Sequence, residues 1–354
     1  MEMRFMKGNE AIAEAAVRAG CRFFAGYPIT PQNEIPEYMS RRLPEVDGTF
    51  VQGESEVASI NMIFGAAATG TRAMTSSSSP GISLKSEGIS YLAGAELPAV
   101  IVNVMRGGPG LGQITPAQTD YLQATKAAGH GGFKMIVLAP STIQEAVDLT
   151  YKAFDYAERD KNPVMIASDG CIGAMMEPVV LPEFKEPPAY NFAGRAKFNP
   201  NYKSVSSSEN FEAAQEVFNK KLADMYEDWN KNDALFEEYM TEDAEYIIAS
   251  YGISARVSKT AIKTLRKEGI KIGLVRPITL SPFPYEAYAK LDSSKVKRII
   301  DVEMAIPAQM IDDVKIAVEG RIPVSSYGRT GGNIITDDNI IDGVMNIIGK
   351  EGGK

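Results

Sequence analysis

Cysteine and histidine are scarce in this chain of 354 residues. There are two cysteines, Cys21 and Cys171, and one histidine, His130. Two cysteines so far apart form no Cys-x-x-Cys pair, which excludes an iron–sulfur cluster, a zinc ribbon and a disulfide framework built by this chain. A single histidine excludes a multi-histidine metal site and argues against a Ser-His-Asp hydrolase. We therefore expect no metal site formed by this chain alone.

The sequence also lacks an excess of positive charge and long apolar runs. It has 37 Lys and Arg against 45 Asp and Glu, a net charge of −8, whereas nucleic-acid and anionic-membrane surfaces need a basic patch. No run approaches the roughly 18 apolar residues of a membrane span. The first 15 residues lack the apolar core of a signal peptide. These features predict a cytoplasmic protein that binds neither nucleic acid nor membrane.

The chain does contain a regular alternation of short β-like runs and helical patterns over its first 180 residues. Residues 99–105 form an almost uninterrupted apolar run, as expected of a strand buried on both faces. Residues 54–69 are rich in alanine and are closed by Gly70, which is typical of a helix. The alternation predicts a doubly wound, mostly parallel α/β sheet, in which ligands bind at the carboxyl ends of the strands.

We expect two α/β domains joined by a connecting segment. Residues 1–180 form the first, and residues 245–354 form a smaller second one. Prolines and Ser206-Ser207-Ser208 interrupt the pattern within 181–244, which we interpret as a linker followed by an amphipathic helix. Apolar side chains of this helix are spaced three and four apart: Phe211, Ala214, Phe218, Leu222, Met225 and Trp229. We predict that this stripe packs against the core, with packing against another subunit as the alternative.

Two acidic or hydroxyl-bearing segments follow predicted strands. Residues 27–31 (Tyr-Pro-Ile-Thr-Pro) form a rigid loop because proline fixes φ and restricts the residue before it. Thr30 in this loop either presents a preoriented hydroxyl or caps the next helix. Glu54-Ser55-Glu56 opens the alanine-rich helix, where the macrodipole favours acidic side chains. A glutamate that enters so apolar a helix is costly unless it is paired or moves a proton.

A third segment combines one cation with many glycines. Arg106 ends the buried strand 99–105 and precedes the glycine-rich loop 107–112, so it is well placed to bind a substrate carboxylate. Residues 113–116 (Gln-Ile-Thr-Pro) do not open a helix after these glycines, which disfavours a dinucleotide site. We expect the loop to let backbone lie close to a ligand or a neighbouring chain. His130 is expected to be a hydrogen-bonded structural residue, and Asp169-Gly170 to form a turn.

The order of these motifs points to one family. The first domain shows residues 27–31, Ser55-Glu56, 75–81 (Thr-Ser-Ser-Ser-Ser-Pro-Gly) and 106–109 (Arg-Gly-Gly-Pro); the second shows 275–278 (Val-Arg-Pro-Ile), 301–304 (Asp-Val-Glu-Met) and Gln309. Over nearly its whole length, the chain resembles the alpha subunit of thiamine-diphosphate-dependent 2-oxoacid:ferredoxin oxidoreductases. Through residues 7–10 and 31–36 it is most similar to the VorB type, which oxidises 2-oxoisovalerate (3-methyl-2-oxobutanoate); the 2-oxoglutarate enzymes are close relatives.

The resemblance implies a fold and a shared cofactor site. The first domain would have the thiamine-diphosphate-binding fold and hold the pyrimidine side of the cofactor, and the second would be transketolase C-terminal-like. The chain lacks the Gly-Asp-Gly…Asn motif that binds the diphosphate and Mg²⁺, and Ser168-Asp169-Gly170-Cys171 is not one. A partner subunit would therefore supply Mg²⁺ and the other half of the site.

The resemblance also implies roles for individual residues. By this resemblance, Glu56 would be the catalytic residue that binds the pyrimidine N1′; we prefer it to Glu54 because it follows the serine. Thr30 and Arg106 would hold the substrate carboxylate. Cofactor contacts are implied for five further residues: Tyr27, Pro28, Ile29, Ser78 and Gly107. The segment around His130 is similar to the family's, but Gly132 stands where an acidic residue often follows, so a catalytic role for His130 is left open.

The reaction implied is the CoA-dependent oxidative decarboxylation of a 2-oxoacid to acyl-CoA and CO₂, with electrons passed to ferredoxin. The partners implied are a diphosphate-binding beta subunit, a gamma subunit and a ferredoxin-like delta subunit, in a dimer of hetero-oligomers. The alternatives are a 2-oxoglutarate or pyruvate enzyme, a non-catalytic assembly subunit, and a nucleotide-binding α/β protein.

Overall fold

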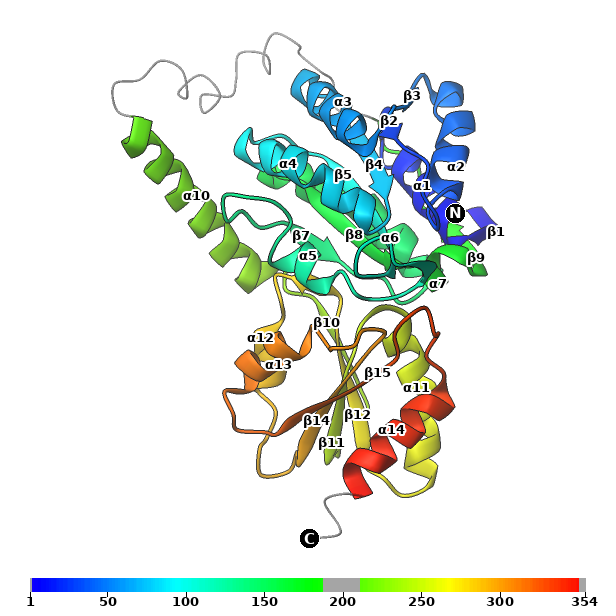
Figure 1. Cartoon of the computed structure of the whole chain (residues 1–354), viewed down its shortest axis with the longest axis vertical. Coiled ribbons are helices and arrows are strands. Elements are labelled where there is room, and N and C mark those ends of the chain that lie inside the picture. Colours follow the sequence, from blue (N-terminus) through cyan, green and yellow to red (C-terminus); the bar gives the residue numbers. More distant parts are fainter. Residues whose placement is uncertain (1, 187–210, 350–354) are drawn as a thin grey trace.

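The larger of two open sheets forms the upper part of the molecule in Figure 1. The computed structural model describes residues 2–186 and 211–349. The sheet has the order β13-β7-β8-β5-β4-β2-β3, and all neighbours are parallel except β13 and β7. Its strands are β2 (Phe23–Gly26), β3 (Thr49–Gln52), β4 (Ala73–Ser77), β5 (Val100–Gly107), β7 (Ile136–Leu138), β8 (Val164–Asp169) and β13 (Thr279–Ser281); β6 (Gln113–Pro116) pairs antiparallel with β5.

Helices cover both faces of this sheet. The bounds are α1 (Gly8–Arg18), α2 (Glu34–Arg42), a 3₁₀ turn (Pro44–Val46), α3 (Glu56–Thr69), α4 (Pro80–Gly94), α5 (Tyr121–Thr125), α6 (Ile143–Asp160) and α7 (Gly170–Ala174). All eight residues of β5 are buried. Val102 and Val104 pack in the core of α1, α2 and α6, whereas Ile101 and Met105 pack in the core of α3 and α4. The strand predicted from the apolar run is therefore confirmed, because alternate side chains enter two different cores.

The second sheet lies below the first and has the order β10-β12-β11-β14-β15, parallel except at β10. Its elements are β10 (Phe236–Tyr239), β11 (Tyr246–Ala249), α11 (Gly252–Lys267), β12 (Ile272–Pro277), α12 (Tyr285–Ala289), β14 (Arg298–Glu303), α13 (Ile311–Val318), β15 (Val324–Gly328) and α14 (Asp337–Gly349). A separate two-stranded ribbon joins β1 (Glu2–Lys7) to β9 (Met176–Leu181). The expected doubly wound α/β fold is confirmed.

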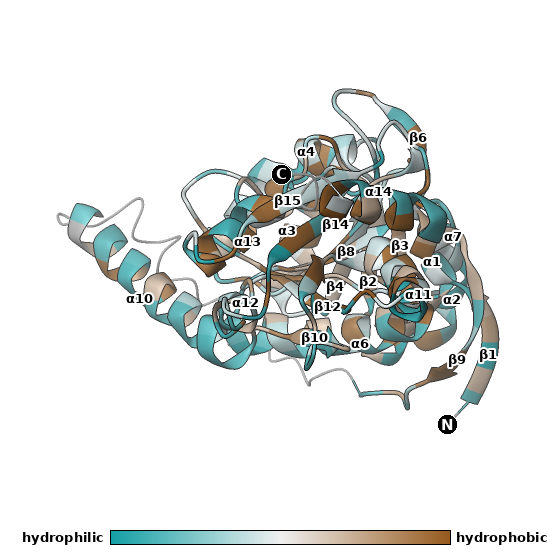
Figure 2. Ribbon diagram, turned by 90° about the horizontal axis from the view of Figure 1, so that it is seen from below, coloured by the Kyte–Doolittle hydropathy of each residue, from teal (hydrophilic) through white to brown (hydrophobic). Residues whose placement is uncertain are grey.

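Helix α10 (Phe211–Asn232) precedes the second sheet and lies along the side of the first. Figure 2 shows mostly hydrophilic residues on this helix. Of the predicted stripe, Phe218 and Trp229 are buried and Leu222 and Met225 are half-buried, and Trp229 Nε1 donates to Asp160 Oδ2 at 2.9 Å. The predicted linker lies largely outside the described residues, as does Ser206-Ser207-Ser208. Within residues 2–186 and 211–349, no helix has the length and apolar content of a membrane-spanning segment.

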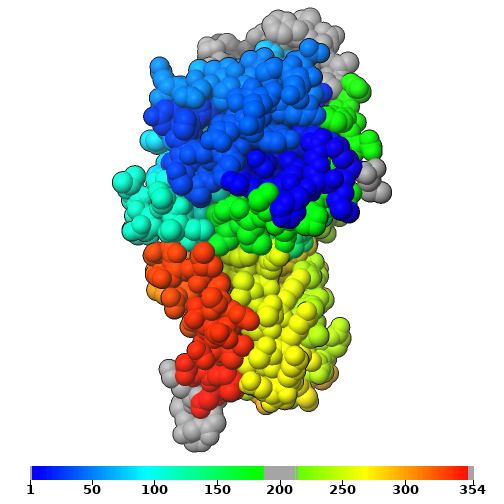
Figure 3. Space-filling view, turned by 90° about the vertical axis from the view of Figure 1, so that its right-hand side faces the viewer, coloured from blue at the N-terminus to red at the C-terminus, as the bar shows by residue number. Residues whose placement is uncertain are grey.

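Two buried side chains join the upper and lower parts, which Figure 3 shows in contact. Gln118 donates to the carbonyl of Tyr251 at 2.9 Å and accepts from Ser254 Oγ at 2.6 Å and from the Met304 amide at 2.9 Å. Asp169 Oδ2 accepts from the Ile253 amide at 2.9 Å. The side chain of residue 118 therefore ties the first sheet to two segments of the second.

The expectation that Asp169 and Gly170 form a turn is wrong. Asp169 Oδ1 accepts from the amides of Cys171 and Ile172 and so caps α7. Its Oδ2 accepts from the Ile253 amide in the first turn of α11. Burial raises the pKa of Asp169 to about 6, against these three amide hydrogen bonds, which lower it. A carboxylate has two acceptor oxygens, so Asp169 can bind the first turns of α7 and α11 at the same time and join the two domains.

We expect Asp169→Asn to destabilise the protein by about 1–3 kcal/mol, because the amide group replaces one acceptor with a donor that faces a buried N–H. Denaturant unfolding would measure this. The control is Asp47→Asn, since Asp47 is exposed and has a left-handed φ of 55° that asparagine also tolerates. Equal stabilities for the two variants would contradict the role of Asp169 as a joint.

Candidate functional site

Four adjacent strands bring all three predicted loops to one edge of the first sheet. β3, β2, β4 and β5 are parallel neighbours, so the loops that follow them lie together. We call this the carboxyl edge. It carries residues 27–31 after β2, Glu56 after β3, Ser78 after β4 and the glycine-rich loop after β5.

Arg106 holds two of these loops together. Its Nη1 donates to the carbonyl of Thr30 at 2.9 Å and its Nη2 to the carbonyl of Leu111 at 3.0 Å. The residue is 4% exposed, and its Nε is buried with no hydrogen-bond partner among the described residues. Guanidinium groups bind anions through such N–H donors, so Arg106 is a candidate anion-binding residue.

The proline-rich loop presents its residues to the outside of this edge. Tyr27, Pro28 and Thr30 are exposed, and Ile29 is half-buried. Thr30 does not cap the next helix, because α2 begins at Glu34 and Asn33 is its N-cap residue. The capping interpretation of Thr30 is therefore wrong, and its side chain lies exposed in a loop whose backbone is held by Arg106.

The two glutamates at the start of the alanine-rich helix differ in environment. Ser55 is the N-cap, its Oγ accepting from the Ala58 amide at 3.1 Å, so the helix begins at Glu56 and not at Glu54 as expected. Glu54 is exposed, whereas Glu56 is 6% exposed. Its carboxylate accepts no hydrogen bond from a described side chain or amide. The residue as a whole is nearly enclosed, but its carboxylate oxygens are not among the fully buried atoms that lack a partner, so they remain open to a ligand.

Glu56 lies over the first turn of α4, where only glycine leaves room for it. A Cβ added at Gly81 would come within 2.9 Å of Glu56 Oε1 and would also overlap Ser77 Oγ. The hydroxyls of Ser77 and Ser78 are buried at the end of β4 and have no hydrogen-bond partner in the described part of the chain. The Glu56 carboxylate and the unpartnered hydroxyls of Ser77 and Ser78 therefore lie around the first turn of α4.

A buried network fixes the turn between β4 and α4. Ser79 adopts a φ of 28°, which is rare for a residue with a side chain. Its amide donates to Asn103 Oδ1 at 3.0 Å, its Oγ donates to Asp120 Oδ2, and Asn103 Nδ2 donates to the same oxygen at 3.0 Å. Burial raises the pKa of Asp120 against these hydrogen bonds. The sequence analysis did not identify Asn103 or Asp120, because an Asn within an apolar strand gave no sign of its partner.

Lys85 of α4 was also missed. It is fully buried, and its Nζ donates to Thr75 Oγ1 and, at 3.3 Å, to the carbonyl of Ser76. Burial lowers the pKa of Lys85 to about 7, and the Glu56 carboxylate acts in the opposite direction. The one sequence signal was a lysine one turn after Gly81 in a helix of small and apolar residues.

His130 does not lie with the carboxyl-edge residues. It is exposed, and its ring contacts Tyr91 edge-on at a centroid distance of 5.9 Å. It lines a pocket of about 750 Å³ between α3, α4 and α10, together with Phe133 and Phe218. Neither Thr30, Glu56 nor Arg106 lines this pocket. The structure therefore places His130 apart from the other predicted site residues.

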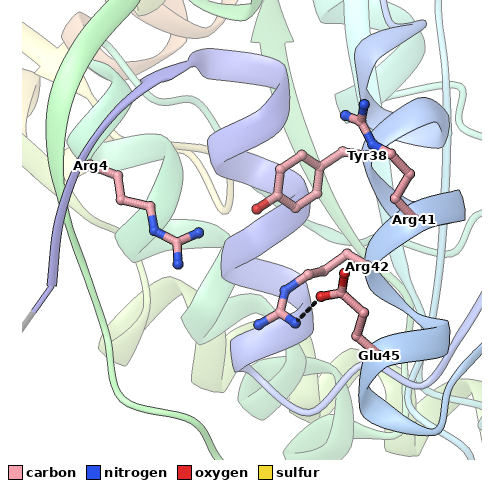
Figure 4. Close-up of a pocket in the computed structure, with 5 residues that line it drawn as sticks. All are labelled: Arg4, Tyr38, Arg41, Arg42 and Glu45. Atoms are coloured by element: carbon pink, nitrogen blue, oxygen red, sulfur yellow. Dashed lines mark hydrogen bonds and ion pairs between the residues drawn. The ribbon is translucent and has the colours of Figure 1, made fainter.

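A smaller pocket of about 350 Å³ lies between β1 and the end of α2 (Figure 4). It is lined by Arg4, Tyr38, Arg41, Arg42 and Glu45. Arg42 forms ion pairs with Glu14 and Glu45, and Arg4 with Glu2. Since acidic neighbours already neutralise these two arginines, and Glu45 precedes the amino end of β3, we do not assign the site here.

Two solved structures share this architecture. The 2-oxoglutarate:ferredoxin oxidoreductase from Magnetococcus marinus matches with a TM-score of 0.86 and 27% identity, over 98% of this chain and 65% of that longer chain. A split-gene transketolase matches with a TM-score of 0.60 and 15% identity, over 96% of this chain and 97% of that one. Together with the match of residues 14–240 to a thiamine-diphosphate-binding domain, the likeness to the first structure defines the class of this protein, a subunit with the thiamine-diphosphate-binding fold.

Sequence comparisons narrow the class. Residues 14–240 match the thiamine-diphosphate-binding domain of pyruvate flavodoxin/ferredoxin oxidoreductase, and residues 244–340 match core domain II of pyruvate:ferredoxin oxidoreductase. Ketoisovalerate oxidoreductase subunit VorB from Methanothermobacter marburgensis is 47% identical over 99% of both chains. 2-Oxoglutarate synthase subunit KorA from Methanocaldococcus jannaschii is 36% identical over 94% of this chain and 97% of its own. The chain belongs to the 2-oxoacid:ferredoxin oxidoreductase family, as the motifs predicted, and is one subunit of such an oxidoreductase.

We expect Gly81→Ala to displace Glu56 and to destabilise the protein by about 1–3 kcal/mol, because the new methyl group overlaps the carboxylate and Ser77. Thermal unfolding would measure the loss. Gly94→Ala is the matched control, since Gly94 ends the same helix and an added Cβ there meets nothing within 4 Å. A loss of stability no larger than in Gly94→Ala would show that Glu56 does not lie over this turn.

Proposed function

We propose that the chain is the pyrimidine-binding, alpha-type subunit of an enzyme that converts 2-oxoisovalerate, CoA and oxidised ferredoxin to the acyl-CoA, CO₂ and reduced ferredoxin. The observation that carries the proposal is the buried Glu56 carboxylate at the carboxyl edge, at the start of a helix. The names and identities of the VorB and KorA relatives agree with it.

The residues around Glu56 fit the pyrimidine side of thiamine diphosphate. Glu56 offers an acceptor for a protonated ring nitrogen, and the hydroxyls of Ser77 and Ser78 are buried donors without partners among the described residues. Thiamine diphosphate, when bound, would supply a nucleophilic thiazolium carbon for the 2-oxo group. Glu56 would hold a proton at N1′ of the pyrimidine ring and so favour its imino tautomer. Tyr27, Pro28, Ile29 and Gly107 lie on the flanking loops and are proposed to contact the cofactor.

Arg106 and Thr30 support a carboxylate subsite beside it. Arg106 is buried, forms no ion pair with a described carboxylate, and retains an unfilled Nε donor. Its two terminal nitrogens donate to the carbonyls of Thr30 and Leu111, and these hydrogen bonds fix the orientation of the guanidinium group. We propose that Nε and the exposed Thr30 hydroxyl hold the carboxylate of the 2-oxoacid, so that the oxo group is oriented for attack.

The positions of other arginines favour a branched aliphatic 2-oxoacid over 2-oxoglutarate, which needs a second cation. Arg22 and Arg72 precede β2 and β4, at the opposite edge of the sheet, and Arg72 pairs with Glu158. Arg41 and Arg42 line the pocket of Figure 4. None of these four reaches the carboxyl edge.

The other half of the cofactor site is proposed to come from partner subunits. The described residues contain no group of three or more His, Cys, Asp or Glu side chains able to hold a metal ion. Leu111 and Ile114, beside the carboxyl edge, are 82% and 60% exposed, as fits a surface covered by another chain. We propose a beta subunit that binds Mg²⁺ and diphosphate, with gamma and ferredoxin-like delta subunits that receive the electrons, in a dimer of hetero-oligomers.

Glu56→Gln tests the catalytic assignment. In the assembled complex we expect it to slow deuterium exchange at C2 of bound thiamine diphosphate by at least about 10²-fold, because the amide cannot hold the ring proton. Quenched-flow NMR of the exchange would measure this. Glu54→Gln is the matched control, since Glu54 lies two residues away and is exposed. Exchange at the wild-type rate in Glu56→Gln would refute the assignment.

The substrate proposal has its own test. The complex assembled with its partner subunits should reduce a viologen dye with the highest kcat/KM on 2-oxoisovalerate, at least about 10-fold above 2-oxoglutarate, because the dicarboxylate lacks its second cation. CoA-dependent dye reduction with both acids and with pyruvate would measure the ratios. A preference for 2-oxoglutarate or pyruvate would overturn this choice and leave the Glu56 assignment untouched.

A further inference from the structure

Gln309 belongs to the second domain, but the hydrogen-bond partners of its side chain among the described residues lie in the first. Its Nε2 donates to the carbonyl of Thr119 at 2.8 Å, and its Oε1 accepts from the amide of Leu122 at 3.0 Å. Both polar atoms of one neutral side chain are therefore bound to the backbone of residues 119–122. The proposed chemistry gives this residue no role.

The backbone of Gln309 is anchored at the end of β14. Glu303, the last residue of this strand, is fully buried, and its Oε1 accepts from the Gln309 amide at 2.9 Å. The next residue, Met304, exchanges hydrogen bonds with Gln118. The Gln118 amide donates to the Met304 carbonyl at 3.1 Å, and the Met304 amide donates to Gln118 Oε1 at 2.9 Å. The second domain thus holds residues 118–122 from the end of a strand in its own sheet.

Two residues of this segment hold the backbone of Arg106 from both sides. Thr119 Oγ1 donates to the Arg106 carbonyl at 3.2 Å and accepts from the Gly108 amide at 3.3 Å. On the other side, the Arg106 amide donates to Ser79 Oγ at 3.0 Å, and this hydroxyl donates to Asp120 Oδ2. Thr119 and Asp120 therefore fix the main chain from which the guanidinium group extends.

We propose that Gln309 is a positioning residue of the carboxylate subsite, which keeps Arg106 in place through Thr119 and Asp120. The proposal rests on the proposed role of Arg106. Gln309 forms no hydrogen bond with Arg106 in the described part of the chain, so it acts through the segment between them. Because its side chain is neutral, its effect is one of position and not of charge, and small displacements of a substrate-binding group are costly for catalysis. The second domain thereby sets the affinity for the 2-oxoacid.

Gln309→Met tests the proposal, because methionine has a similar length, no charge and no amide group. Gln309→Asn is the second variant, since its amide is one methylene shorter and cannot reach both Thr119 and Leu122. Lys126→Met is the matched control. It breaks the ion pair between Lys126 Nζ and Asp313 Oδ1 at 2.7 Å, another contact between the two domains. Within the described residues, the Lys126 side chain makes no hydrogen bond with the carboxyl edge.

The first readout is the steady-state kinetics of the assembled complex with the 2-oxoacid that it prefers. We expect both Gln309 variants to raise the KM for this acid at least about 10-fold, because a displaced guanidinium group holds the carboxylate poorly. The KM for CoA, and C2 exchange of bound thiamine diphosphate without substrate, should stay within about 2-fold of wild type, because neither requires Arg106. A purely structural glutamine predicts lower thermal stability and an unchanged KM.

Three results of these measurements would overturn the proposal. They are an unchanged KM for the 2-oxoacid in the Gln309 variants, an equal rise of this KM in Lys126→Met, and a fall in C2 exchange that matches the rise in KM. The last would show that the whole site is disturbed and not the carboxylate subsite alone.

Thr119→Val tests the intervening link and serves if neither Gln309 variant assembles. It removes the hydroxyl that binds the Arg106 carbonyl and leaves the Thr119 carbonyl that Gln309 binds. The KM for the 2-oxoacid should rise by a similar factor. An unchanged KM would overturn the route from Gln309 to Arg106.

The second readout separates the role of Gln309 from that of Arg106. Arg106→Met removes the positioned group, so Gln309→Met should raise the KM by less than about 2-fold further in that background. A further rise of the full size would overturn the proposal, because Gln309 would then act by another route. If Arg106→Met alone leaves the KM unchanged, the proposed carboxylate role of Arg106 fails, and the positioning role fails with it. If Arg106→Met raises the KM and the Gln309 variants do not, only the positioning role fails.

Discussion

The burial of the Glu56 carboxylate is the constraint on which the arrangement of the site depends. A charged side chain that is largely enclosed by protein depends on its immediate surroundings, and two neighbouring features shape them. Ser55 caps the helix so that Glu56 occupies its first turn, where the macrodipole favours an anion. Gly81 leaves the space that the carboxylate occupies, because a Cβ at this position would come within 2.9 Å of Glu56 Oε1. A polar site has thus been built into the contact between two mostly apolar helices.

The rest of the carboxyl edge keeps its shape through hydrogen bonds within the chain. Arg106 ties the loop of Thr30 to the glycine-rich loop, and Asn103 and Asp120 hold Ser79 in an unusual backbone conformation. Groups preset in this way lose little freedom when a ligand binds, which is the general basis of preorganised catalysis. The atoms left without partners, on Ser77, Ser78 and Arg106, are those proposed to meet cofactor and substrate.

The second sheet takes part in this edge although it carries none of the proposed catalytic groups. Gln118 is held by Tyr251, Ser254 and Met304, and the side-chain amide of Gln309 donates to the carbonyl of Thr119 at 2.8 Å. The next residue, Asp120, belongs to the network around Ser79. A short segment, residues 118–120, therefore links the joint between the sheets to the turn that bears Ser78.

The sequence alone determined the fold class and the loops that carry the site. The apolar run 99–105 and the strand–helix alternation specify a parallel sheet, and parallel strands place their loops at one edge. The expectation for Asp169 was wrong because a local pattern cannot show that its carboxylate meets an amide of α11, far away in the chain. The expected start of α3 was wrong because Ser55, and not Glu54, provides the N-cap. Only the tertiary structure decided that Glu56 is buried while Glu54 is exposed, that His130 lies apart, and that Asp120 belongs to the site. The physical reason is that burial and charge compensation arise from contacts between segments far apart in the chain, such as β4 with α3 and α4, and periodicity within one segment carries no record of them.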